Sequence, residues 1–215
     1  MTSRHRAADL TKVRTVPLRS RPNLVGIKDF AKAVEKGSSF GAFMDSFCAI
    51  EHRVDAASNL RNLVASIGKA KRKRKPIVWG LGPHLIKYGL SPLIIHLMKK
   101  GYVSAIAMNG ACAIHDAEIA LIGETSEEMA GEIETGRFGM AAETGEFINA
   151  AARTAYEQGL GFGESLGGKL RAAKAPFRKH SLLASAYDFG LPATVHVAIG
   201  TDIIHMHPTM DGAAT

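Results

Sequence analysis

The pattern of residues 102–118, YVSAIAMNGACAIHDAE, does most to restrict what this chain can fold into. A short apolar run, Val103 to Met108, ends in the small residues Asn109 to Cys112, and His115 and Asp116 follow within one helical turn. Apolar runs of this length are typical of buried strands in parallel sheets. The pattern therefore predicts a strand, a tight turn and a helix whose first N–H groups would point at a bound anion.

Two further strand-to-loop transitions place this pattern in an α/β sheet. Residues 77–79 form a short apolar run that stops at GLGP, residues 80–83, and a helical segment at 84–100 leads to the next strand. A β-α-β unit of this size has parallel strands and a right-handed crossover. A third apolar run spans residues 194–199. We therefore predict a Rossmann-like, open, mainly parallel sheet with flanking helices.

Helices are also indicated by three- and four-residue spacing of apolar side chains. Ser39 is the expected N-cap of the first of them. The predicted helices cover residues 40–48, 50–73, 112–122, 138–158, 164–174 and 181–189, with a polar, acidic segment at 123–136.

Length and composition fit one domain preceded by an arm. The chain has 215 residues, 46% of them hydrophobic, which suffices for one packed core. Residues 1–22 lack periodicity and are predicted to be a flexible basic arm, and residues 23–215 are predicted to be the α/β domain. No apolar run reaches the roughly 18 residues of a membrane helix. We expect a cytoplasmic protein whose two cysteines, Cys48 and Cys112, are free thiols.

The net charge of +7 comes from two basic segments, residues 1–22 and the run Lys69 to Lys75. A basic run can contact phosphate groups. Bases at the end of a helix are also expected without any ligand, because they complement its dipole. Nucleic acid is therefore not an expected partner, and a non-catalytic binding protein that uses this run remains an alternative.

Ligands of open parallel sheets bind beyond the carboxyl ends of the strands. This rule makes residues 80–84, 109–116 and 200–207 the candidate site. No GxGxxG motif follows any of the three strands, so the usual dinucleotide signature is missing. His84, His115 and His205 are candidates for acid–base chemistry, because imidazole exchanges protons near neutral pH.

A metal-dependent hydrolase is a further alternative, because imidazole and carboxylate groups are suitable ligands for first-row metals. Their spacing matches no known zinc motif. The candidate ligands would be His115, Asp116, His196, Asp202, His205 and His207.

Three segments resemble the deoxyhypusine synthase family, in particular its bacterial branch: residues 85–123, 137–147 and 195–208. The resemblance implies a Rossmann-like homotetramer with NAD bound near the subunit interface. It also implies a reaction in which NAD oxidises spermidine and the aminobutyl group passes through an enzyme lysine. The final acceptor would be a protein lysine or a polyamine, and no metal would take part.

The resemblance also assigns roles to individual residues. His115 stands where eukaryotic members carry an acidic catalytic residue, and Asp202 matches the carboxylate that holds one amine of spermidine. The family continues well beyond the position of Thr215, and that further part holds its catalytic lysine. We therefore expect a truncated family domain that does not complete the transfer. The residues matching cofactor-binding positions are Pro83, His84, Asn109, Gly110, Ala111 and Asp116.

Overall fold

The computed structural model describes residue 14, residues 16–20, residue 22 and residues 33–49 and 56–215. The chain divides into two compact units, Met1–Ser66 and Ile67–Thr215. Most of the predicted arm, residues 1–22, lies outside the described residues, so its flexibility stays a prediction.

The first unit contains a short 3-10 helix, η2 (Leu18–Ser20), the helix α1 (Phe40–Ala49) and most of α2 (Ala56–Arg72). The predicted N-cap is confirmed, because Ser39 Oγ accepts the backbone N–H of Ala42 at 3.1 Å. An ion pair between Arg61 and Asp45 joins the two α-helices. The predicted helix over residues 50–73 is described from Ala56 onward.

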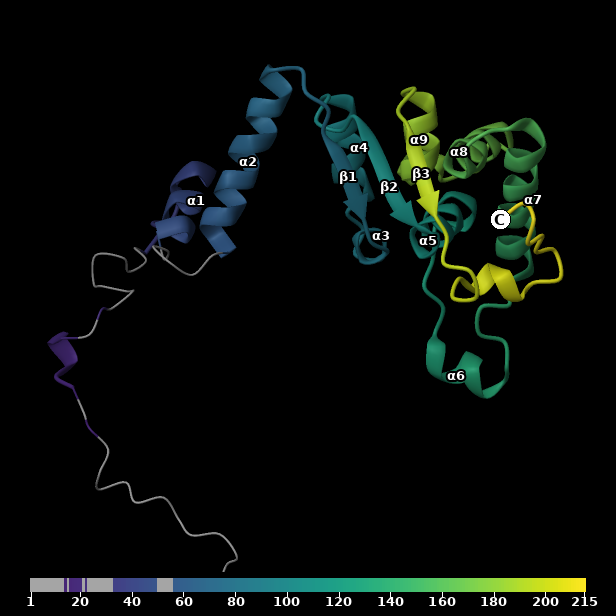
Figure 1. Cartoon of the computed structure of the whole chain (residues 1–215), viewed down its shortest axis with the longest axis horizontal. Coiled ribbons are helices and arrows are strands. Elements are labelled where there is room, and N and C mark those ends of the chain that lie inside the picture. Colours follow the sequence, from purple (N-terminus) through teal and green to yellow (C-terminus); the bar gives the residue numbers. More distant parts are fainter. Residues whose placement is uncertain (1–13, 15, 21, 23–32, 50–55) are drawn as a thin grey trace, which may run out of the picture. The chain divides into compact units, whose positions relative to one another are not determined.

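The second unit is built on three strands: β1 (Val78–Leu81), β2 (Ala105–Asn109) and β3 (Ala193–His196). Their order in the sheet is β1-β2-β3, and both pairs are parallel. All three arrows run toward the end where α5 and α6 lie (Figure 1). The predicted fold class, an open parallel α/β sheet with flanking helices, is confirmed. The third strand is shorter than expected and ends at His196.

The helix α5 (Gly110–Ile122) follows β2 without a break and lies at the centre of this unit. Its side chains Cys112, Ala113 and Ala117 are almost completely buried. Within the described residues, no helix is long and apolar enough to cross a membrane. The other helical elements are α3 (His84–Lys87), α4 (Ser91–Lys99), α6 (Met129–Glu134), α7 (Ala142–Gln158), α8 (Phe162–Ala172), η4 (Arg178–His180), α9 (Leu182–Asp188) and η5 (Ile203–Met206).

Burial alternates along β2. Ile106 and Met108 are buried in the core, whereas Ala105 and Ala107 are only partly buried. The expectation of a strand buried on both faces is therefore wrong. Alternation of this kind is typical of a sheet with one well-covered face.

The helix α6 was not predicted, because its sequence looks like a polar loop. It begins after Glu128, whose carboxylate accepts the backbone N–H groups of Ala130 and Gly131 at 3.0 and 2.8 Å. Glutamate is not among the preferred N-cap residues, so the sequence carried no start signal. The long helix predicted from residue 138 likewise begins only at Ala142.

Candidate ligand-binding site

A pocket of about 230 Å³ lies where the segments that follow the three strands meet. Lys87 comes from the segment after β1, Ala111 and His115 from the helix after β2, and Asp202 from the loop after β3. Pockets for drug-sized ligands measure roughly 300–1,000 Å³, so this one suits a smaller molecule. Its apolar walls are Ile114, Met129, Phe138 and Ile203.

A chain of hydrogen bonds runs from a carboxylate to His115 in the wall of this pocket. Thr125 donates its hydroxyl hydrogen to Glu118 Oε2 at 2.5 Å. Its oxygen lies 2.6 Å from Nδ1 of His115 and must therefore accept the Nδ1 hydrogen. The unprotonated nitrogen of the neutral ring is then Nε2, and no described residue hydrogen-bonds to it. His115 can accordingly accept a proton from a ligand.

Glu118 is held in its ionised form. Burial by itself would raise the pKa of Glu118, but the nearby His115 ring and the hydrogen bonds from Thr125 and Thr144 outweigh burial and lower it. The Thr144 hydroxyl donates to Oε1 at 3.1 Å. Glu118 Oε2 lies 3.7 Å from His115 Nδ1, so Thr125 bridges the two side chains.

Asp202 lies over the first residue of α5. A Cβ atom added at Gly110 would overlap the Asp202 carboxylate, so only glycine permits this approach. Asp202 Oδ2 also accepts the backbone N–H of Ala198 at 3.2 Å. A carboxylate is favourable at this end of a helix dipole, but it repels a second anion. The predicted nucleotide cradle at Asn109–Ala111 therefore fits a phosphate poorly, and NAD binding stays a prediction without support from this geometry.

Asp116, which was predicted to bind the cofactor, is fully buried in the protein interior. Its carboxylate accepts the hydroxyl hydrogen of Ser181 at 2.5 Å and the backbone N–H groups of Leu182 and Leu183 at 2.6 and 3.0 Å. These groups form the N-terminus of α9. Asp116 therefore holds α9 against α5 and does not line the pocket.

The remaining predicted positions also lie outside the pocket lining. Asn109 is the N-cap of α5, and its side chain accepts the N–H of Cys112 at 3.0 Å. Pro83 occupies the N-cap position of α3, and His84 is exposed beside the ring of Tyr88. Of the predicted site residues, the structure places Ala111, His115 and Asp202 in one pocket, with Gly110 beneath Asp202.

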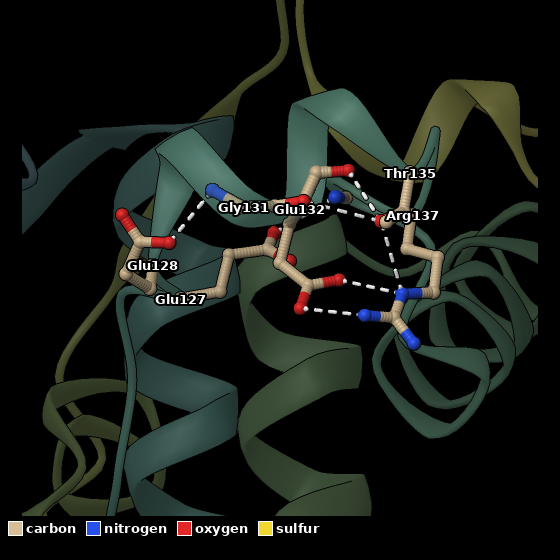
Figure 2. Close-up of polar contacts among 7 residues, drawn as sticks. Glu127, Glu128, Gly131, Glu132, Thr135 and Arg137 are labelled. Carbon is tan, nitrogen blue, oxygen red and sulfur yellow. Dashed lines mark hydrogen bonds and ion pairs between the residues drawn. The ribbon is translucent and has the colours of Figure 1, made fainter.

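One wall of the pocket comes from an excursion of the chain, residues 124–140, which carries α6. Its two ends are joined by a hydrogen bond from the Gly139 N–H to Glu127 Oε1, at 2.8 Å. Further along, Arg137 forms a two-point contact with Glu132 at 3.0 and 3.3 Å (Figure 2). The excursion is thus tied at its base and again near its tip.

The residues proposed as metal ligands do not converge. His207 lies against the carbonyl of Gly139 and His196 against the hydroxyl of Thr194, at 2.8 and 2.9 Å. Asp116 is committed to α9. Among the described residues, no group of three or more His, Cys, Asp or Glu side chains could hold a metal ion. The metal-dependent hydrolase alternative is therefore not supported.

Fold and site define an α/β protein with an open parallel sheet. A scan against protein-family models and a search of curated proteins find no match. A solved structure, apo ArgZ, an arginine dihydrolase from the ornithine–ammonia cycle in cyanobacteria, is similar at 20% sequence identity and a TM-score of 0.44. The similarity covers 70% of this chain and 19% of ArgZ, so this chain matches about a fifth of that protein.

These comparisons contradict the identification with the deoxyhypusine synthase family. No model of that family matches, and a solved structure that is similar to this chain is an arginine dihydrolase. The assignment as an NAD-dependent aminobutyl transferase acting on spermidine is therefore wrong. The similarity to ArgZ is too distant to transfer an activity in its place.

Several pocket residues were missed by sequence reasoning. Glu118 lies three positions after His115 on one helix, and this spacing places both side chains on the same face. That signal was available. Thr125 and Glu127 lie in the segment that looked like a polar loop, where no pattern distinguishes them from their neighbours.

Proposed function

We propose that this chain binds a small molecule carrying an amino group and that His115 exchanges a proton with it. The observation that carries the proposal is the hydrogen-bond chain from Glu118 through Thr125 to His115 in the pocket wall. A histidine oriented by a carboxylate through an intervening group has the arrangement of a general base.

The charges around the pocket support a cationic ligand. Glu118, Glu127 and Asp202 contribute three carboxylates, whereas Lys87 is the one lysine or arginine in the lining. Glu127 and Asp202 each accept a single backbone N–H, so their carboxylates can accept further hydrogen bonds. An ammonium group would form charge-assisted hydrogen bonds with them. The apolar walls would hold a short carbon chain.

Binding of n-butylammonium is expected to shift the NMR signals of the His115 ring, whereas butyrate of the same size is expected to leave them unchanged. Asp202→Asn should weaken the butylammonium affinity about tenfold, because it removes a buried charge partner. The measurement is a titration of histidine-labelled protein, with His115→Gln used to assign the signal. Asp188→Asn is the matched control, since Asp188 pairs with Arg171 away from the pocket. Tighter binding of butyrate, or an equal loss in the control, would contradict the proposal.

The hydrogen-bond chain also predicts which ring nitrogen carries the proton. In neutral His115, 15N NMR should find the hydrogen on Nδ1 and an unprotonated Nε2. Thr125→Val removes the acceptor, so both tautomers should become populated, while Thr154→Val, outside the pocket lining, should change nothing. A proton found on Nε2 in the unaltered chain would exclude His115 as the base.

A further inference from the structure

The strand β1 is an open edge of the sheet. The carbonyl of Ile77 accepts the backbone N–H of Ser104, just before β2, at 2.8 Å. Alternate residues of a strand direct their N–H and C=O groups to opposite sides, so Trp79 and Leu81 also face β2. The backbone groups of Val78 and Gly80 therefore face away from β2, and no described strand pairs with them. Val78 is 64% exposed, and a Cβ at Gly80 would meet no atom within 4 Å. An unpaired, accessible edge of this kind can accept another strand.

A cluster of exposed cations precedes this edge directly. We name residues 72–75, Arg-Lys-Arg-Lys, the basic segment. All four side chains are exposed, and none has an ion-pair partner among the described residues. Lys71 differs, because its ammonium group donates to the carbonyl of Lys100 and lies 3.7 Å from the centre of the Tyr102 ring. The positive charge of the basic segment is therefore not neutralised by an ion pair with any described residue.

Arg74, within the basic segment, adopts a backbone conformation in which glycine is favoured. It has a φ of 53°, in the left-handed region, where glycine is favoured because it has no Cβ. The position follows the end of α2, and the N–H of Lys75 closes the helix by donating to the carbonyl of Ala70 at 2.9 Å. Glycine is the common residue at such helix ends. An arginine here suits a role for its side chain.

We propose that the β1 edge and the basic segment together bind an extended acidic peptide segment of a partner protein. The peptide would add a strand beside Val78 and Gly80, and its carboxylates would pair with the basic segment. Nucleic acid fits less well, because its backbone cannot complete a strand ladder. The aromatic residue of β1, Trp79, is partly buried, and its ring N–H donates to the carbonyl of Tyr102 at 3.0 Å, which leaves less of the ring for a base to stack on.

The test uses the full chain and a labelled peptide of about ten residues, enough to span a strand, with alternating glutamate and valine. Trp79 is the single tryptophan and lies in β1, so its emission reports events at this edge. We expect Trp79 emission to change on binding. A peptide N-methylated at alternate residues keeps its charge but cannot pair, and we expect its affinity to fall more than tenfold. Equal affinity of the two peptides would overturn the strand addition.

Protein variants test the role of charge. Arg74→Gly should raise the melting temperature by about 2–4 °C, because glycine adopts the left-handed backbone conformation without strain. The same substitution should weaken peptide binding by about threefold, because it removes one positive charge. Lys73→Gln with Lys75→Gln should weaken binding further, whereas the matched exposed pair Lys174→Gln with Lys179→Gln should not. Unchanged binding in the first two variants would refute the proposal. So would an oligothymidylate of the same charge that binds more tightly than the peptide, since this would indicate a nucleic-acid surface.

Discussion

Replacing Asp116 by alanine is expected to lower the free energy of unfolding at pH 7 by about 3 kcal/mol. The substitution leaves the Ser181 hydroxyl and the N–H groups of Leu182 and Leu183 without their acceptor in a buried place. Each buried donor that loses its partner costs about 1–3 kcal/mol, and release of the costly buried charge offsets part of the sum. Denaturant unfolding followed by circular dichroism measures this loss.

The stability lost in Asp116→Ala should also depend on pH, in a direction that follows from the pKa of Asp116. Burial, partly countered by the hydrogen bonds from Ser181, Leu182 and Leu183, raises the pKa of Asp116 from 3.8 to about 6. The folded state therefore binds a proton more tightly than the unfolded state. This contribution to stability is fully present below pH 4 and is lost as the pH rises through 6. The stability difference between the unaltered chain and Asp116→Ala should accordingly grow by about 2–3 kcal/mol from pH 7 to pH 4.

Two controls separate this effect from general acid unfolding. Asp116→Asn removes the titrating group at nearly the same volume, so its stability should lack the Asp116 contribution to the pH dependence. Asp188→Ala removes a partly exposed carboxylate of a surface ion pair and should cost less than about 1 kcal/mol at either pH. A stability difference that shrinks toward pH 4 would mean that Asp116 is not the proton-binding group.

Replacing Gly163 by alanine is expected to destabilise the chain by about 3 kcal/mol, although alanine is the better helix former. The added Cβ would overlap the backbone carbonyl oxygen of Ala193 in β3. A backbone atom cannot swing aside as a side chain does, so α8 would have to move away from the strand. The close approach of α8 to β3 therefore requires glycine at this position.

Gly161→Ala is the matched control, at the N-cap of α8, two residues before Gly163. Its φ is −68°, which alanine adopts readily, and its added Cβ would meet no atom within 4 Å. This variant should remain within about 0.5 kcal/mol of the unaltered chain. Thermal unfolding of the two variants side by side checks the prediction, and equal stabilities would show that α8 can shift without loss.

The fold was largely predictable from local patterns. Apolar runs located all three strands, and helical spacing located the helices at Phe40–Ala49, Gly110–Ile122 and Ala142–Gln158 to within a few residues. The exceptions have physical causes. The helix α6 is capped by a glutamate, and the strand run near Val103 looked fully buried because alanine occurs on covered and open faces alike.

The candidate site was less predictable, because the sequence indicates which helix or strand a residue belongs to but not which other element its side chain contacts. His115 and Asp116 are neighbours on α5, yet His115 lines the pocket while Asp116 caps α9 in the core. The partners that decide these roles are Thr125, in the segment that looked like a polar loop, and Ser181, 65 positions after Asp116. Short matching segments also misled the assignment of a family, since strand ends with small residues recur in unrelated α/β proteins.

The hydrogen bond between Glu127 and Gly139 has a practical consequence for engineering. Because it closes the base of the excursion, the length of chain beyond it is not fixed by the rest of the fold. Extra residues in a loop that is already closed add little entropic penalty, about 0.6 kcal/mol for each doubling of its length. Residues near Thr135 and Gly136 are exposed at the end of α6. A reporter peptide or a labelling tag inserted there is expected to leave the sheet and the helices packed on it intact, although it would separate Glu132 from Arg137.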